Sequence, residues 1–370
     1  MEFYVFDLNF NRLGIIDDFI DVEIKPSYDS LGQLNLIIDG SKEMVDLLQV
    51  DCIITKTTDI SKGYIIKTRD FLDEKSTELE IIAPSLNVIL NDRLVLGQQE
   101  FTGTIENVMK SFVQVNAVSP VNPNRIIPNL VIASNRGIDI NTTEGTKNVP
   151  LCDYLYALCK KHDVSFDIWL NHVNKKYVFD VWQGTDRSTL QDINPHVIFA
   201  KEFENVLKQN YTESIADVKT TAIVLGEEVE GKPQEIVTVN DTQSGFNRKE
   251  ILVESKDVKK TYKDDNDQEI TLTDAEYKRL LEEAGKNTLA DYQPIRTFES
   301  DVDGESNFVY GIDYFTGDKV SARNDDLGII LHTRIISVVE KVNKQGSSLK
   351  VNFGSNIPDL LDKIKRAVKK

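Results

Sequence analysis

The pair of aspartates in the predicted hairpin 166–181 is the arrangement in this sequence best suited to acid–base chemistry. Apolar and polar residues alternate in both arms of the hairpin, as they do in half-buried β-strands. If Leu170 pairs with Tyr177 across a six-residue loop, Asp167 lies directly opposite Asp180. Glycoside hydrolysis needs two carboxyl groups a few ångströms apart, one as acid and the other as base or nucleophile. A cell-wall glycoside hydrolase that uses Asp167 and Asp180 is therefore one interpretation.

The same hairpin also permits interpretations without catalysis. Trp169 and Trp182 lie on the face that carries the aspartates, so a carbohydrate-binding module could use them. Opposed carboxylates also occur on solvated faces, where a lysine such as Lys175 or Lys176 screens them. We favour this structural role on the same cross-strand argument.

A phosphate-binding loop is the second candidate, and its own residues argue against it. Gly226, four further residues and then Gly231 and Lys232 match the motif up to its last position, which is Pro233. Proline supplies neither the hydroxyl that binds magnesium nor a backbone N–H, and three glutamates in the loop would repel phosphate. Both flanks are rich in β-branched residues. The segment is predicted to join two antiparallel strands, and no nucleotide is expected.

Metal-binding patterns are also weak. Cys152 and Cys159 lie seven residues apart on one face of a predicted helix and are expected in the core, because His162 alone does not complete a tetrahedral set. The acidic run 263–270 has Ile270 where a calcium loop needs glycine. We therefore expect no metal, no cofactor and no catalytic residue.

Length and charge limit the classes of protein that fit. A chain of 370 residues predicts two or three domains. Its 60 acidic and 43 basic residues give a net charge of −17, which argues against a surface that grips nucleic acid. Three cysteines form no disulfide framework and suggest folding in a reducing cytoplasm. Neither a membrane span nor a secretion signal is expected, because no apolar stretch is long enough.

Periodicity divides the chain into four segments and predicts an α+β, mainly β, protein. Residues 1–95 read as short strands with tight turns, typical of an antiparallel barrel or sandwich. An α/β segment occupies 96–203. The β pattern returns over 204–355, interrupted by a helix at 273–290 that starts with capping-box spacing. Residues 356–370 read as a basic amphipathic helix.

The predicted C-terminal helix carries the candidate partner-contact residues. Its apolar residues recur at helical spacing: Ile357, Leu360, Leu361, Ile364 and Val368. Five basic residues cluster near its end, as suits the helix dipole. Amphipathicity requires burial without naming the covering surface. Packing on its own subunit and contact with a partner both remain open.

Ordered segments along the chain resemble one known family. Early ones are VFDLNFNRLGIIDDF, GYIIKTRDF and FTGTIENVMKSFV, and late ones are YGIDYFTGDKVSARN and GIILHTRIISVVE. They are similar to the siphophage tail-tip or baseplate hub proteins, which are relatives of the baseplate hubs of contractile tails. The resemblance runs from about residue 1 to 355 and includes no catalytic signature.

The resemblance implies a structural protein of a phage tail or a phage-tail-like particle. It implies two tail-tube-like antiparallel β-barrel domains, 1–95 and 204–355, with the α/β insertion domain between them and the helix after them. A homotrimer would then present six similar barrels to a hexamer of the distal tail protein. The ring would join the distal tail to tip, spike, fibre or tape-measure proteins.

The resemblance also implies a location and a relation to DNA. The ring would surround a channel through which DNA passes without specific binding. The protein would reside in the virion tail after assembly in the host cytoplasm. Many family members continue into a wall-degrading or receptor-binding part. This sequence stops at Lys370, so we expect no lysin activity from it.

Overall fold

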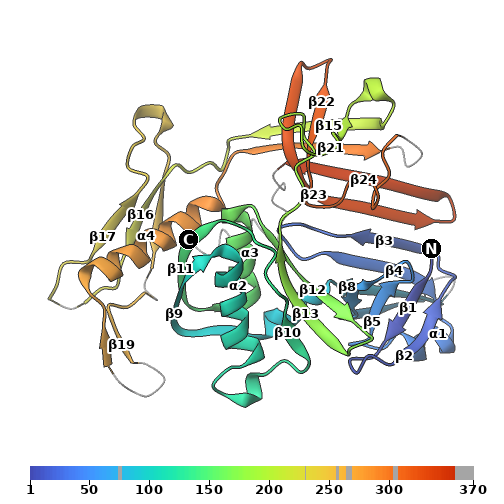
Figure 1. Ribbon diagram of the computed structural model, residues 1–370, viewed down its shortest axis with the longest axis horizontal. Coiled ribbons are helices and arrows are strands. Elements are labelled where there is room, and N and C mark those ends of the chain that lie inside the picture. The colour runs from blue at the N-terminus through green and yellow to red at the C-terminus, as the bar shows by residue number, and fades with distance from the viewer. Residues whose placement is uncertain (74–76, 230, 256–257, 264–268, 303–306, 355–370) are drawn as a thin grey trace.

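The computed structural model shows a mainly β protein with a smaller share of helix (Figure 1). The residues that it describes are 1–73, 77–229, 231–255, 258–263, 269–302 and 307–354. Within these residues, no helix is both long enough and apolar enough to cross a membrane.

The first β unit consists of the four-stranded sheet β2-β1-β5-β6 and the strands β3-β4-β8-β7 of a larger sheet, which share one core. In β4 every second residue is buried, so Leu34, Leu36 and Ile38 point into this core. Ile66 and Lys67 connect β6 directly to β7, so the chain passes from one sheet to the other at this corner. The elements are β1 (Phe3–Phe6), β2 (Arg12–Ile16), β3 (Asp21–Lys25), β4 (Gln33–Asp39), α1 (Lys42–Leu47), β5 (Ile53–Lys56), β6 (Asp59–Ile65), β7 (Thr68–Asp73) and β8 (Thr77–Pro84).

The insertion unit packs two helices and the two-stranded sheet β11-β9 around the three-stranded sheet β10-β13-β12 (Figure 1). Helix α2 follows the N-cap Thr104, whose side chain accepts a hydrogen bond from the backbone N–H of Asn107. The elements are η1 (Leu86–Asp92), β9 (Leu94–Thr104), α2 (Ile105–Val113), η2 (Gln114–Val118), η3 (Pro123–Arg125), β10 (Leu130–Ile132), β11 (Asn141–Pro150), α3 (Leu151–His162), β12 (Ser165–Asn171) and β13 (Lys176–Trp182).

The second β unit continues the large sheet of the first. Its long strand β23 pairs with β22 and β24, and its last residues pair with β3 of the first unit, as in Glu340 with Ile24. The sheet therefore runs β15-β21-β24-β23-β3-β4-β8-β7. The elements are β14 (Ile198–Phe199), η4 (Lys201–Phe203), β15 (Val206–Ser214), β21 (Ile295–Val302), β22 (Lys319–Asn324), β23 (Ile329–Asn343) and β24 (Gly346–Gly354).

This pairing corrects the expectation of two closed barrels. In the part of the chain that is described, the strand pairings form open sheets and none closes on itself. The first unit does not close into a barrel because the backbone N–H and C=O groups along one edge of β3 pair with β23 of the other unit. One continuous sheet therefore links the two β units.

A small appended unit, residues 221–290, lies between β15 and β21. Helix α4 covers one face of the sheet β17-β16-β18, with Val224, Tyr277 and Leu281 in their shared core (Figure 1). The predicted capping box is confirmed, because Thr273 and Glu276 exchange both hydrogen bonds at the helix start. The elements are β16 (Thr221–Leu225), β17 (Ile236–Val239), η5 (Gly245–Asn247), β18 (Glu250–Glu254), β19 (Thr261–Lys263), β20 (Glu269–Thr271) and α4 (Asp274–Ala290).

Candidate functional site: the junction of three units

The two β units and the insertion unit meet around Arg334 of β23. This side chain is only 6% exposed. Its Nε donates to Oδ1 of Asp163 at 2.5 Å, and its Nη1 donates to the carbonyl oxygen of Gly317 at 2.5 Å. The guanidinium carbon also lies 4.9 Å from the ring centre of Tyr28. One buried cation thus contacts the first β unit, the insertion unit and its own unit.

Tyr28 of the first β unit also contacts both other units. Its backbone N–H donates to the carbonyl oxygen of Ile336 at 2.8 Å, and its hydroxyl donates to the carbonyl oxygen of Asp163 at 2.9 Å. Its own carbonyl oxygen accepts from Oγ of Ser165 at 2.5 Å, and its ring meets Trp182 edge-on at 5.2 Å. Burial raises the pKa of Tyr28, so the hydroxyl stays protonated as a donor.

Two glycines allow the insertion unit and the second β unit to touch through their backbones. A Cβ on Gly184 would lie 1.9 Å from the carbonyl oxygen of Gly317. Gly317 has a φ of +92°, and a Cβ there would lie 2.7 Å from the ring of Trp182. Beside this contact, Asp318 accepts from the backbone N–H of Thr185 at 2.8 Å. The junction is therefore closed by backbone approach as well as by side chains.

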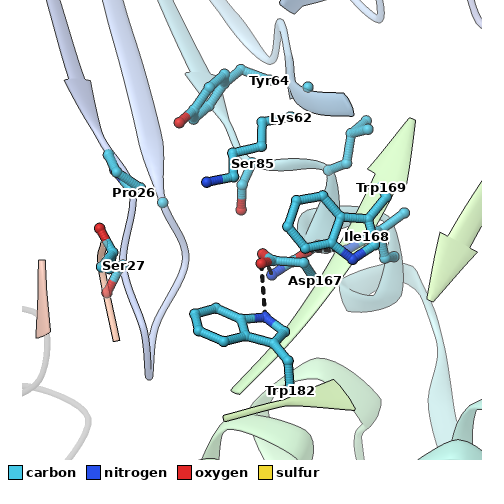
Figure 2. Close-up of a pocket in the computed structure, with 14 residues that line it drawn as sticks. Pro26, Ser27, Lys62, Tyr64, Ser85, Asp167, Ile168, Trp169 and Trp182 are labelled. Carbon is cyan, nitrogen blue, oxygen red and sulfur yellow. Dashed lines mark hydrogen bonds between the residues drawn. The ribbon is translucent and has the colours of Figure 1, made fainter. Parts of the chain in front are cut away.

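A small pocket of about 50 Å³ lies beside the junction, and all three units line it (Figure 2). Asp167 points into it and accepts from Nε1 of Trp182 at 2.9 Å. Burial raises the pKa of Asp167 to about 6, although Lys62 opposes this shift. The Nζ of Lys62 lies 5.8 Å from the ring centre of Trp169. Ligand pockets usually measure about 300–1,000 Å³, so this space is too small for a sugar ring.

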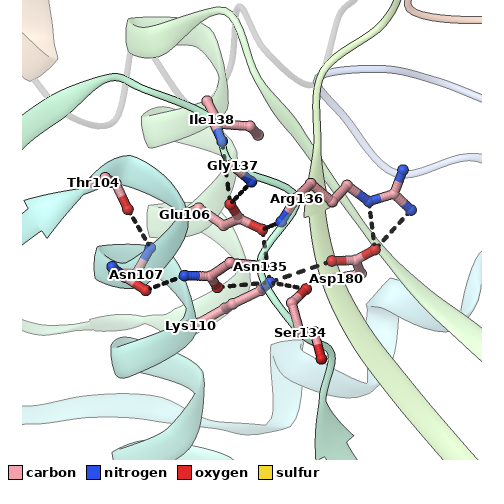
Figure 3. Close-up of polar contacts among 10 residues, drawn as sticks. All are labelled: Thr104, Glu106, Asn107, Lys110, Ser134, Asn135, Arg136, Gly137, Ile138 and Asp180. Carbon is pink, nitrogen blue, oxygen red and sulfur yellow. Dashed lines mark hydrogen bonds and ion pairs between the residues drawn. The ribbon is translucent and has the colours of Figure 1, made fainter.

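The predicted hairpin register is confirmed, because Asp167 pairs with Asp180 and Leu170 pairs with Tyr177. The two carboxylates nevertheless have different surroundings. Asp180 is 5% exposed and forms ion pairs with Lys110 at 3.4 Å and with Arg136 at 2.7 Å (Figure 3). This carboxylate is neutralised by two cations and does not line the pocket. The hydrolase interpretation therefore lacks a second free carboxylate.

The cations that neutralise Asp180 belong to a network around helix α2 (Figure 3). Lys110 pairs with Glu106 at 2.8 Å, one helical turn earlier. Glu106 in turn accepts from the backbone N–H groups of Arg136 at 2.5 Å and Gly137 at 3.1 Å. The sequence suggested Lys175 or Lys176 as the screening groups. The feature of the sequence that could have indicated this network is the i, i+4 spacing of Glu106 and Lys110, which favours an ion pair on a helix.

The tryptophans do not form an exposed stacking surface. Trp182 packs edge-on against Tyr28 and donates its N–H to Asp167. Trp169 has Lys62 over its ring. Both rings are partly buried at the contact between units. They contribute to the junction, and their geometry gives no support to a carbohydrate-binding module.

The segment that resembles a phosphate loop is a hairpin, as predicted. β16 and β17 pair antiparallel on either side of it, with Val224 opposite Val237. The backbone N–H of Gly226 donates to the carbonyl oxygen of Glu235 at 2.9 Å. A Cβ on Gly226 would lie 2.4 Å from the hydroxyl oxygen of Tyr277, which explains the glycine by packing. Lys232 is exposed at the tip.

The remaining candidate residues are packed in the protein or lie outside the residues that the structure describes. Cys152 and Cys159 are buried in the insertion core, as predicted. His162 contacts Glu144. Among the described residues, no group of three or more His, Cys, Asp or Glu side chains is arranged to hold a metal ion. The predicted helix 356–370 and its contact residues lie outside the described residues.

Three solved structures share the fold of the whole chain. Prophage tail protein gp18 from Listeria monocytogenes EGD-e is 12% identical, with a TM-score of 0.51 over 100% of this chain and 99% of that chain. The tail protein from Neisseria meningitidis MC58 is 12% identical, with a TM-score of 0.54 over 96% of each chain. The 43 kDa tail protein of prophage MuSo2 from Shewanella oneidensis is 10% identical, with a TM-score of 0.53 over 95% of this chain and 98% of that chain.

The family comparison gives the assignment. Among curated proteins, none matches the chain. The family model described as Siphovirus ReqiPepy6 Gp37-like protein matches residues 2–355, nearly the whole sequence. The resemblance to siphophage proteins inferred from the sequence is thereby confirmed. The chain belongs to the Siphovirus ReqiPepy6 Gp37-like family and has the fold of the prophage tail proteins named above.

Proposed function

We propose that this protein is a structural, non-enzymatic hub of a phage tail tip or of a phage-tail-like particle. The observation that carries the proposal is the junction, together with the sheet that continues from β23 into β3. These contacts fix two β units at one relative position. A ring component that must match another ring needs such a fixed spacing between its contact surfaces. The family and the shared fold support the same role.

The ring that we propose contains three copies of the chain. Each copy contributes two tube-like β units, residues 1–95 and 204–355, so the ring presents six related surfaces. A hexamer of the distal tail protein is the partner on that side. The described sheets are open, so each β unit offers edge strands such as β15 and β2 for completion by neighbouring chains.

The charge of the chain suits a DNA conduit. Each copy carries −17, and a ring of such copies repels phosphates instead of binding them. DNA would then pass through the channel during ejection without being retained. In this proposal the protein is assembled in the host cytoplasm and functions in the virion tail.

The C-terminal segment 356–370 is the proposed contact with the next distal component, which is a spike, fibre, tip or tape-measure protein. It is basic and carries the apolar candidate residues Ile357, Leu360, Leu361, Ile364 and Val368. An isolated helix of this length is marginal in water, so it needs a covering surface. The three segments of the ring would provide three such contacts on one side.

Light scattering tests the ring and the segment together. We expect the full chain to have a mass three times the 41.9 kDa of one chain. We expect a chain that ends at Ser355 to keep this mass but to bind the distal component at least about tenfold more weakly, a loss of about 1.4 kcal/mol. A monomer for the full chain would contradict the ring. A truncated chain that no longer forms trimers would place the segment in the subunit core instead.

A further inference from the structure

A cluster of three carboxylates, two of them buried, lies where α4 of the appended unit packs against the insertion unit (Figure 1). Its members come from four elements, β9, β11, α3 and α4. The acids are Glu100 of β9, Glu144 of β11 and Glu283 of α4, and the cations are Lys161 and His162 of α3 and Arg279 of α4. The junction and the proposed ring contacts do not use this cluster.

Glu144 accepts hydrogen bonds from three side chains of the insertion unit. Its side chain is fully buried and accepts from Lys161 at 2.8 Å, from His162 at 2.6 Å and from Thr142 at 2.7 Å. Burial alone would raise the pKa of Glu144, but these three hydrogen bonds lower it. Glu144 therefore stays ionised and presents a negative charge to α4.

Glu283 faces this charge with few partners of its own. The residue is 6% exposed, and its Oε2 has no hydrogen-bond partner. Its Oε1 accepts from Nη1 of Arg279 at 3.2 Å, and the same guanidinium also binds Glu100. Burial raises the pKa of Glu283 to about 7, Arg279 opposes the shift, and Glu144 adds to it. A buried carboxylate with one shared cation is costly when ionised.

We propose that Glu283 acts as a proton-dependent latch, which holds α4 against the insertion unit when it is protonated and loosens this contact when it ionises. The geometry carries the proposal, because a buried acid with an unpartnered oxygen lies opposite a fully satisfied anion at a contact between two units.

Two further charges act on Glu283 in opposite directions, because Lys161 of α3 lowers its pKa and Glu100 of β9 raises it, and the pKa remains raised to about 7. The strands β16 and β17 meet α4 through apolar residues such as Val224 and Val239. On the α3 side, the buried hydroxyl of Tyr154 also lacks a hydrogen-bond partner, and burial followed by the charge of Glu144 raises its pKa. Tyr154 therefore stays neutral while Glu283 titrates.

The direction of the pH effect follows from the raised pKa. An acid whose pKa is higher in the docked state than in the open state favours docking at low pH, and this contribution is lost as pH rises through about 7. With an open-state pKa near 4.3, the opening constant of α4 should rise about tenfold between pH 6 and pH 8.

Hydrogen exchange on the full chain tests the latch, with protection factors corrected for the intrinsic effect of pH. We expect the protection of α4 in the wild type to fall about tenfold from pH 6 to pH 8. Glu283→Gln should abolish this fall and remain protected at pH 8. Glu282→Gln is the matched control, because Glu282 is the exposed neighbour on the same helix, and it should keep the wild-type pH dependence.

Two outcomes would overturn the latch. One is wild-type protection of α4 that stays constant from pH 6 to pH 8. The other is a Glu283→Gln variant that retains the wild-type pH dependence, which would assign it to another group such as His162. Both variants keep His162 and Glu144, so their difference isolates Glu283.

Discussion

Replacing Arg334 with methionine is expected to lower the free energy of unfolding by about 2–4 kcal/mol. Methionine retains the apolar stem and removes every donor. The buried carbonyl oxygen of Gly317 then loses its guanidinium partner, and Asp163 loses a bidentate pair. The ring of Tyr28 also loses the cation above it. Urea unfolding followed by tryptophan fluorescence measures the change, because Trp182 lies at this junction.

The control for this variant is Arg296→Met in the same large sheet. The guanidinium of Arg296 pairs with Glu213, and both side chains are exposed, at 61% and 46%. Exposed pairs contribute about 0–1 kcal/mol, so this variant should unfold close to the wild type. Equal effects of the two substitutions would show that Arg334 does not hold the three units together.

Replacing Gly184 with alanine should be at least as damaging, with a loss of about 3 kcal/mol or more. The new Cβ would lie 1.9 Å from the oxygen and 2.2 Å from the carbon of the Gly317 carbonyl group. Both are backbone atoms, so no side chain can rotate away to make room. The insertion unit and the second β unit must separate. Thermal unfolding and limited proteolysis between residues 183 and 197 measure this separation.

Gln183→Ala is the neighbouring control for the glycine variant. Gln183 is exposed and donates a single hydrogen bond from Nε2 to the carbonyl oxygen of Asp163 at 2.8 Å. Its loss should change stability by less than about 1 kcal/mol. A Gly184→Ala variant that is as stable as this control would mean that the two backbones are not in close contact in solution.

Local patterns predicted the local features of this molecule. Alternation placed Asp167 opposite Asp180, because a shift of one residue would turn the apolar face of the hairpin to solvent. The spacing of Thr273 and Glu276 predicted the start of α4. The proline at position 233 and the flanking strands excluded the phosphate loop in favour of a hairpin. Each of these features depends on residues that are close in the sequence.

Contacts between segments that are far apart in the sequence could not be predicted from local patterns. Arg334 and Asp163 are 171 residues apart, and nothing in either segment indicates the partner. Asp21 and Asn343, at the pairing of β3 with β23, are 322 residues apart. Alternation predicts strands but does not state which edges meet, so separate barrels were expected where one sheet continues. The strands of the appended unit were assigned to the second β domain for the same reason, although β16, β17 and β18 form a separate sheet.

The most direct test of the proposed hub is a cryo-EM reconstruction of the assembled tail tip that contains this chain. We expect three copies around the tail axis, with residues 1–95 and 204–355 alternating as six quasi-equivalent β units against the distal ring. We also expect the contacts of Arg334 with Asp163 and Tyr28 to be unchanged in every copy. A different number of copies, or a chain attached outside the channel ring, would contradict the assignment as a hub.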